Sequence, residues 1–343
     1  MFYLRVDGNQ TIASGHVMRC MAIAGQIEKM GESCVFITAD EEPKRLIEEN
    51  GFSVRCLHTS WSDMEGELPT LLTLIKECNI KKLLVDSYFI TPRYLEQLKE
   101  VVSVFYMDDL NRFLYPVDTL INYGIQYPLY HYEENYKESG TTLLLGCDYI
   151  PLREEFQGIK PRLSGKVKNI LITTGGTDPF RMEIEIFEKL KEKDCCFYII
   201  CGAMNGNYEE LHKLEKKYKN VRIYKNVKKM TDIMKACDLA ISAGGTTLYE
   251  LAACGLPTVS FSFTDNQIEG AQEFAKQKII PYAGDARNGM ETCCQTIALS
   301  IEELEKDYEN RKQISLKMQK LIDGNGAERI AARCVQAEER NED

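Results

Sequence analysis

The stretch LAISAGGTTLYELAACGLPT, residues 239–258, decides the fold class. Its apolar start, Leu239–Ser242, is typical of a buried strand, and a small turn with two glycines follows. Thr247–Ala253 has the composition of a helix, and a Gly and a Pro separate it from a second strand-like run, Thr258–Phe261. Strands joined through a helix pair in parallel, so this segment predicts one βαβ unit of an open α/β sheet.

The same alternation of short apolar runs and amphipathic segments extends in both directions from this unit. Further strands are expected at Phe2–Val6, Cys34–Thr38, Phe52–Leu57, Lys82–Asp86, Val102–Met107, Leu120–Asn122, Asn169–Thr174, Cys196–Cys201 and Val221–Tyr224. Helices are expected between them, one at Pro69–Cys78, whereas the polar stretch Tyr123–Gly140 predicts a loop with a short helix. The pattern predicts parallel sheets with helices on both faces.

The length of 343 residues exceeds the usual size of one domain. The run Cys147–Gly165 contains several Pro and Gly residues and is the best linker candidate. We therefore expect an N-terminal Rossmann-like domain over residues 1–155 and a C-terminal Rossmann-like domain over residues 156–325. A C-terminal helical tail over residues 326–343 completes this division. Two such α/β domains are expected to face each other across a ligand-binding cleft.

Charge and composition exclude several classes of protein. The net charge of −10 argues against nucleic-acid binding, which needs a concentrated basic face. No apolar run reaches the ~20 residues of a membrane helix, so membrane insertion is not expected. The 13 cysteines show no Cys-x-x-Cys pair, which favours reduced core thiols over a zinc site. The sequence opens directly into a strand-like run without a secretory signal, which predicts a soluble, cytoplasmic protein.

Three strand ends lead into helices through small, flexible turns. These turns lie at residues 7–16, 174–178 and 242–247. Ligands of open α/β sheets bind at the carboxyl ends of the strands, and a helix N-terminus attracts an anion. No turn has the Walker or the dinucleotide-binding spacing, and a Gly-Gly turn alone is also common in ordinary βα connections. Glu250 either completes a capping box with Thr247 or accepts hydrogen bonds from a ribose.

The four histidines differ in their sequence context. His58, His131 and His212 lie in polar segments and are expected at the surface. His16 follows Gly15 at a strand-to-helix turn, where a neutral imidazole could take a proton from water. A histidine that bonds its own helix end is an equal alternative.

The adjacent acids Asp108 and Asp109 are not expected to form a catalytic pair, because neighbouring strand residues point to opposite faces. Asp109 is expected to cap a turn.

A resemblance to known families rests on these segments. Residues 239–258 resemble the nucleotide-binding signature of the MurG-like branch of GT-B glycosyltransferases. The N-terminal run from Arg5 through Gly15-His16 to Cys20 resembles UDP-2,4-diacetamido-2,4,6-trideoxy-β-L-altropyranose hydrolases of pseudaminic acid synthesis and the related spore-coat polysaccharide proteins. Further matching stretches are Val85–Tyr88, Asp108-Asp109, Leu152–Phe156, Gly175–Asp178 and Asn266-Gln267. Ser87 departs from the pattern, because some members carry a His there.

The resemblance implies a metal-independent hydrolase without a cofactor, which acts on a UDP-activated diacetamido sugar and releases UDP and the free sugar. His16 would be the general base. The implied substrate-binding residues are Arg5, Asp7, Gly15, Arg19, Tyr88, Asn266 and Gln267. The implied UDP-binding residues are Gly175, Gly176, Thr177, Asp178, Gly244, Gly245, Thr246, Thr247 and Glu250. A downstream nonulosonate synthase is the expected pathway partner.

Two other functions are compatible with the same motifs. A GT-B glycosyltransferase would pass the sugar of a UDP-amino sugar to an acceptor instead of water. The polar, small region at residues 10–14 favours hydrolysis over a membrane-docking transferase. A non-catalytic UDP-sugar-binding protein would bind the same ligand without turnover and would be indifferent to substitution of His16.

Overall fold

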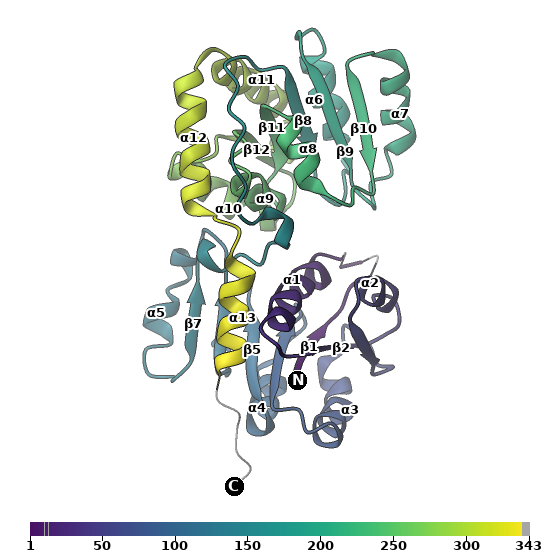
Figure 1. Ribbon diagram of the computed structural model, residues 1–343, viewed down its shortest axis with the longest axis vertical. Helices are drawn as coiled ribbons and strands as arrows, with labels where there is room; N and C mark the ends of the chain where they lie inside the picture. The colour runs from purple at the N-terminus through teal and green to yellow at the C-terminus, as the bar shows by residue number, and fades with distance from the viewer. Residues whose placement is uncertain (10, 13, 338–343) are drawn as a thin grey trace. The chain divides into compact units, whose positions relative to one another are not determined.

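The computed structural model describes residues 1–9, 11–12 and 14–337, and these residues form two compact units (Figure 1). The first unit comprises Met1–Glu154 together with the segment that begins at Asn325, and the second comprises Glu155–Gly324. The chain therefore leaves the first unit after Glu154 and returns to it after Gly324. Both units are α/β structures with an entirely parallel sheet, as the alternation of elements predicts.

The sheet of the first unit has the order β3-β2-β1-β4-β5-β6-β7. Its strands are β1 (Phe2–Val6), β2 (Cys34–Thr38), β3 (Ser53–Cys56), β4 (Lys82–Asp86), β5 (Ser103–Met107), β6 (Thr119–Asn122) and β7 (Thr142–Leu145). The central strands β1, β4 and β5 are buried along their whole length, as expected where helices cover both faces. The sequence analysis missed β7, which lies between the polar stretch Tyr123–Gly140 and the linker candidate Cys147–Gly165.

Helices of the first unit are α1 (Gly15–Lys29), α2 (Lys44–Glu49), α3 (Met64–Glu77), α4 (Pro92–Val101), α5 (Tyr132–Asn135) and α13 (Gly326–Gln336). Short 3₁₀ turns lie at Tyr127–Tyr130, Cys147–Tyr149 and Glu154–Phe156. Helix α3 begins five residues before the predicted start at Pro69, because the side chain of Asp63 accepts a hydrogen bond from the backbone N–H of Gly66. A capping residue therefore sets this boundary.

The C-terminal helix α13 is an integral part of the first unit. It packs beside α1 (Figure 1), and its Ile330 and Cys334 are fully buried. The ammonium group of Lys82, at the start of β4, donates to the carbonyls of Cys334 and Val335 at 3.2 and 2.9 Å. A cation at the carbonyl end of a helix is favourable. Gly326 fits against the backbone of Ile150, where a Cβ would lie 2.2 Å from the carbonyl oxygen.

The sheet of the second unit has the order β10-β9-β8-β11-β12-β13. Its strands are β8 (Asn169–Thr173), β9 (Cys196–Cys201), β10 (Val221–Lys225), β11 (Leu239–Ala243), β12 (Thr258–Ser262) and β13 (Tyr282–Asp285). Its helices are α6 (Met182–Leu190), α7 (Tyr208–Lys217), α8 (Met230–Ala236), α9 (Thr247–Ala253), α10 (Asp265–Lys276), α11 (Met290–Lys306) and α12 (Tyr308–Leu321), with a 3₁₀ turn at Ala286–Asn288. Strands β11 and β12 pair in parallel on either side of α9, which confirms the predicted βαβ unit. Neither α10 nor β13 was identified from the sequence.

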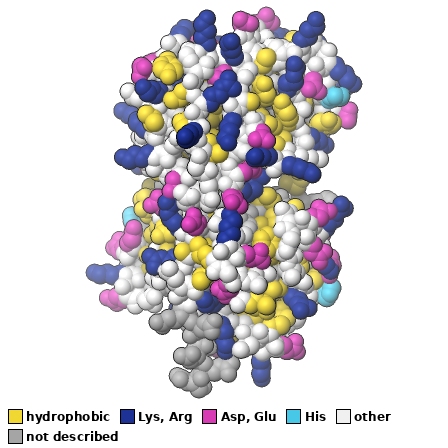
Figure 2. Space-filling view, viewed as in Figure 1, with side chains coloured by type: hydrophobic (Ala, Val, Ile, Leu, Met, Phe, Trp, Pro, Cys, Tyr) yellow, Lys and Arg dark blue, Asp and Glu magenta, His cyan; other side chains and the backbone are white. Residues whose placement is uncertain are grey.

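Surface charge in the second unit is not what the net charge suggests. Eight basic residues from the second half of α7 to the residue before α8 are all exposed: Lys213, Lys216, Lys217, Lys219, Arg222, Lys225, Lys228 and Lys229. Figure 2 shows many Lys and Arg side chains on the visible surface of this unit. A net charge of −10 thus coexists with a locally basic segment, so net charge alone is a weak argument against polyanion binding.

All 13 cysteines are free, and most are buried, in agreement with the prediction of reduced core thiols. Within the described ranges, every helix is too short or too polar to span a lipid bilayer.

Candidate active site

A histidine–carboxylate pair lies at the carboxyl ends of two central strands of the first unit. His16 is the second residue of α1, which follows β1, and Asp86 is the last residue of the neighbouring strand β4. Nδ1 of His16 lies 2.6 Å from Oδ1 of Asp86, although the two residues are 70 positions apart. Both side chains are almost completely buried. His16 therefore bonds a carboxylate from another strand and not its own helix end.

Arg19 lies one turn further along α1 and completes the environment of this carboxylate. Its Nε and Nη2 donate to the two oxygens of Asp86 at 2.6 and 2.5 Å, which is a bidentate ion pair. Its Nη1 donates to Asp109 at 2.7 Å and to the hydroxyl of Tyr123 at 2.5 Å. Burial alone would raise the pKa of Asp86, but the charge of Arg19 and the contact with His16 hold this pKa well below its usual range.

The tautomer of His16 follows from these contacts. An ionised carboxylate only accepts hydrogen bonds, so Nδ1 of His16 carries the proton that is shared with Asp86. Nη2 of Arg19 lies 3.0 Å from the same Nδ1, but both atoms are then donors and form no hydrogen bond with each other. In the neutral imidazole, Nε2 then holds the lone pair, and no group in the described part of the chain hydrogen-bonds to it. The site therefore presents Nε2 as a basic atom.

Tyr88 borders the imidazole, in the loop that follows β4. The two rings are perpendicular, with centroids 4.4 Å apart. The Tyr88 hydroxyl donates to Asp109 at 3.3 Å, and burial raises the pKa of this phenol. The expectation that Asp109 caps a turn is wrong. Asp108 caps it, by accepting from the backbone N–H groups of Leu110 and Asn111, and Asp109 faces Arg19 and Tyr88 instead.

Arg5 and Asp7 belong to a buried ion-pair network. Arg5 has no exposed surface, and its guanidinium donates to Asp7 at 2.6 Å and to Glu67 at 2.8 and 2.5 Å. Asp7 also accepts from the backbone N–H of Ala39, and Tyr94 donates to Glu67. These contacts contradict a direct role of Arg5 in substrate binding, because the side chain is fully buried and each of its three nitrogens already donates to a carboxylate inside the protein. Its role is to support the loop after β1.

Gly15 is exposed, and a Cβ added there would meet no atom within 4 Å. In the same loop, Asn9 accepts from the backbone N–H groups of Thr11 and Ile12. The argument against a membrane-docking transferase rested on residues 10–14. Two of these, Gln10 and Ala13, lie outside the described residues.

The turn between β8 and α6 contains the first group of predicted UDP-binding residues. Gly175 adopts φ +85°, and Gly176 and Thr177 are exposed. The carboxylate of Asp178 is buried and accepts from the backbone N–H groups of Met182 and Glu183 at 2.8 and 3.0 Å. This contradicts a role for Asp178 in holding UDP, because it already occupies the start of α6 and would repel a diphosphate.

A buried carboxyl group lies beneath this turn. Glu183 accepts from the N–H and the hydroxyl of Thr174 and from the side-chain amide of Asn205. Burial raises the pKa of Glu183 to about 8, although these hydrogen bonds oppose the shift. The network ties the loops after β8 and β9 together. Gly202 permits their close approach, since a Cβ there would lie 2.1 Å from the carbonyl oxygen of Gly175.

The turn between β11 and α9 contains the second group of predicted UDP-binding residues. The N–H groups of Gly244 and Gly245 already donate to Phe261 and Ala243, so they are not available to a diphosphate. Thr246 precedes α9, and Thr247 is the first residue of this helix. Among the described residues, the side chain of Thr246 accepts no capping hydrogen bond. The proposed capping box, with Thr247 as the cap, is therefore not formed.

Asn266 and Gln267 lie at the start of α10. Asn266 is exposed and accepts from the hydroxyl of Thr264 at 2.7 Å. Gln267 accepts from the backbone N–H of Phe263 at 3.0 Å, and its backbone approaches Gly244 closely. The structure thus brings Gln267 next to the β11–α9 turn within the second unit.

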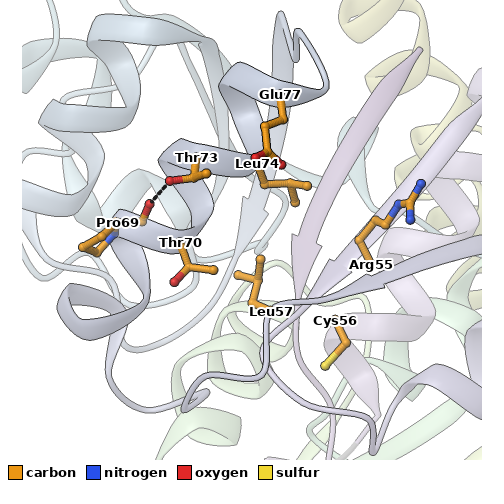
Figure 3. A pocket seen from close by; sticks show the side chains of 8 residues that line it. All are labelled: Arg55, Cys56, Leu57, Pro69, Thr70, Thr73, Leu74 and Glu77. Carbon is orange, nitrogen blue, oxygen red and sulfur yellow. Dashed lines mark hydrogen bonds between the residues drawn. The ribbon is translucent and has the colours of Figure 1, made fainter.

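A separate hollow of about 460 Å³ lies in the first unit between the end of β3 and α3 (Figure 3). It is lined by Arg55, Cys56, Leu57, Pro69, Thr70, Thr73, Leu74 and Glu77. None of the predicted site residues is among them.

Sequence reasoning missed Asp86, Asp109 and Tyr123 as members of the site. Asp86 could have been found, because it is an acid at the end of a buried strand and lies two residues before Tyr88. The pairing of β1 with β4, which brings it to His16, is a long-range feature that a single sequence does not show.

Two parallel-sheet domains of this kind define the fold class, and comparison with solved structures identifies it as the two-domain GT-B fold. The crystal structure of MurG from Acinetobacter baumannii superimposes with a TM-score of 0.70 at 12% identity, covering 98% of this chain and 99% of that one. A UDP-glucosyltransferase from Polygonum tinctorium gives a TM-score of 0.69 at 12% identity, with the same coverage. These likenesses establish the fold alone.

Sequence comparison identifies particular relatives and confirms the resemblance. Residues 169–325 match the glycosyltransferase family 28 C-terminal domain. The spore coat polysaccharide biosynthesis protein SpsG of Bacillus subtilis is 25% identical over 95% of both chains. A Helicobacter pylori protein named as a pseudaminic acid cytidylyltransferase and UDP-2,4-diacetamido-2,4,6-trideoxy-beta-L-altropyranose hydrolase is 28% identical over 88% of this chain. An uncharacterized protein of Methanocaldococcus jannaschii is 28% identical over 79%. This chain spans 48% of the Helicobacter protein and 57% of the Methanocaldococcus protein.

Proposed function

We propose that this chain is a hydrolase that cleaves a UDP-2,4-diacetamido-2,4,6-trideoxy sugar at C1, in the biosynthesis of the nonulosonic acid pseudaminic acid or of a surface polysaccharide. The observation that carries the proposal is the 2.6 Å contact between His16 and Asp86, which leaves Nε2 as a base. The names of the Bacillus and Helicobacter relatives support the substrate class.

In the proposed reaction, Nε2 of His16 takes a proton from a water molecule while the water oxygen attacks C1 of the sugar. The bond between C1 and the diphosphate oxygen breaks, and its electron pair leaves with UDP. Asp86 stabilises the imidazolium that forms, and Arg19 keeps Asp86 ionised and oriented. A positioned base of this kind contributes about 10²–10⁴-fold in rate.

The proposed UDP site uses backbone groups of the second unit. In the described part of the chain, the N–H groups of Gly176, Thr177, Thr246 and Thr247 have no intramolecular acceptor, whereas those of Gly175, Gly244 and Gly245 do. We assign the first four to the diphosphate and the glycines to the shape of the turns. Preorganised backbone donors can stabilise the charge that develops on the leaving group.

The experiment is incubation of the purified protein with UDP-2,4-diacetamido-2,4,6-trideoxy-β-L-altropyranose in the absence of any acceptor, followed by NMR of the products. We expect UDP and the free sugar in equal amounts. Binding without product would overturn the proposal and favour a binding protein.

A GT-B glycosyltransferase is the second candidate, because the family 28 domain and the superimposed structures are those of glycosyltransferases. If the chain is a glycosyltransferase, UDP is released only when an acceptor is added. The proposed hydrolase releases UDP at the same rate with and without one.

A further inference from the structure

A cluster of three different side chains lies at the carboxyl ends of β2 and β3, and none of its members is among the residues assigned to the reaction. It consists of Glu41, Cys56 and His58. Cys56 is the last residue of β3, His58 follows two residues later, and Glu41 lies in the loop after β2. One side-chain donor atom from each residue lies within 4.8 Å of the other two.

The backbone fixes the relative positions of these residues. Thr38 of β2 pairs with Cys56, and the N–H groups of Leu57 and Thr59 donate to the carbonyls of Thr38 and Ala39, both at 2.9 Å. His58 lies between these two bonds with φ +55°, an uncommon backbone conformation for a residue other than Gly. The two strand ends therefore hold the histidine and the cysteine on the same side.

The distance between the two stronger donors suits a tetrahedral metal. Sγ of Cys56 lies 3.5 Å from Nδ1 of His58. Ligands at about 2.3 Å for Zn–S and about 2.0–2.1 Å for Zn–N lie about 3.5–3.6 Å apart when the geometry is tetrahedral. The separation is thus that of two adjacent ligands of one Zn²⁺ ion.

Glu41 can supply the third ligand. Its side chain is exposed, and Lys44 contacts one of its two oxygens, Oε2, at 2.8 Å. An exposed carboxylate can rotate, and a shift of about 1 Å brings an oxygen to ligand distance. Thiolate, imidazole and carboxylate together favour Zn²⁺ over Mg²⁺ or Ca²⁺, which prefer oxygen ligands only.

We propose that Glu41, Cys56 and His58 form a Zn²⁺ site with three protein ligands, the fourth position being taken by water. Binding replaces the thiol proton of Cys56 by the metal, so one proton is released to solvent for each ion bound at neutral pH. The ion links the ends of β2 and β3 and takes no part in the proposed hydrolysis. The site is independent of the assigned function.

The test uses the full-length protein after treatment with a chelator. One equivalent of Co²⁺ should give a thiolate-to-cobalt charge-transfer band and the visible bands of tetrahedral Co²⁺, and one equivalent of Zn²⁺ should remove both. Calorimetric titration with Zn²⁺ in buffers of different ionisation enthalpy should report the release of about one proton. Mg²⁺ should compete with neither ion.

Three variants and one control identify the ligands. Cys56→Ser should abolish the charge-transfer band. Glu41→Gln should weaken Zn²⁺ binding at least about 10-fold, and so should His58→Asn. Asn tolerates the backbone conformation of His58, so this variant keeps the fold if Cys56→Ser does not. The control is Cys196→Ser, since Cys196 is half-buried like Cys56 but lies in the second unit. Absence of the band in the unmodified protein overturns the proposal, as does its persistence in Cys56→Ser or unchanged affinity in His58→Asn.

Discussion

The site around His16 in the first unit and the glycine turns of the second unit are built in opposite ways. Around His16, charged side chains are buried, and Asp86 and Arg19 satisfy each other's hydrogen bonds. In the turns at Gly176 and Thr246, exposed backbone groups lack intramolecular acceptors among the described residues. Proton transfer needs one fixed tautomer, whereas an anion can be held by any set of converging N–H groups. The first arrangement suits the chemical step, and the second suits binding.

The largest expected effect is that of His16→Phe. Removing the base should lower the hydrolysis rate by about 10²–10⁴-fold, because the proposed mechanism assigns the proton of the water to His16. The dissociation constant for UDP, measured by calorimetry, should stay unchanged, since UDP is assigned to the second unit. His212→Gln is the matched control, because His212 lies on α7 and contacts only surface groups. If the His16→Phe protein kept its activity, His16 would not be the base, and the assignment of the chemical step to this region would be wrong.

Asp86→Asn should have the next largest effect on the rate, about 10–10²-fold. The amide no longer stabilises the imidazolium and can favour the wrong tautomer of His16. The variant also removes the carboxylate that pairs with Nε and Nη2 of Arg19, although Asp109 still pairs with Nη1. Breaking a buried ion pair costs up to about 3–5 kcal/mol, so melting curves must accompany the kinetics. A purely structural role for Asp86 would lower stability and leave the hydrolysis rate of the folded protein unchanged.

Gly202→Ala tests the glycine turns of the second unit. A Cβ at this position would lie 2.1 Å from the carbonyl oxygen of Gly175 and 2.5 Å from that of Gly176, so the β8–α6 turn must shift. We expect the affinity for UDP to fall about tenfold and the protein to lose about 1–3 kcal/mol of stability. Gly206→Ala is the control, because a Cβ there meets nothing within 4 Å. Equal affinities of the two variants for UDP would exclude this turn from the nucleotide site.

The smallest effect on activity is expected at Glu183, where the readout is stability against pH. Its pKa in the folded protein is about 8, above the ordinary value of 4.5 for a glutamate, so folding favours the protonated carboxyl. The stabilisation is present below about pH 4.5 and is lost as the pH rises through 8, at roughly 1 kcal/mol per pH unit. Chemical denaturation between pH 5 and 8 measures it. Glu183→Gln should remove this slope, and an unchanged slope would assign it to other groups.

The sequence was sufficient for the fold class because strand and helix periods are local. The βαβ unit at residues 239–258 was predicted and is present in the structure. His16 was identified from its place after a glycine turn. Its partner Asp86 was not, because strand order in a sheet depends on contacts between residues far apart in the chain. The misassignment of Arg5 has the same origin, since its burial depends on Glu67 in α3.

The return of the chain to the first unit at Asn325 has a consequence for the order of folding during synthesis. Residues 155–324 are an insertion between two parts of one α/β body, so the second unit is fully synthesised while the first still lacks α13. Until α13, which contains Cys334, has been synthesised, Lys82 and the face of α1 that packs against α13 remain uncovered. Within this chain, the first unit is therefore begun before the second and completed after it, and loss of α13 would damage the unit that contains His16.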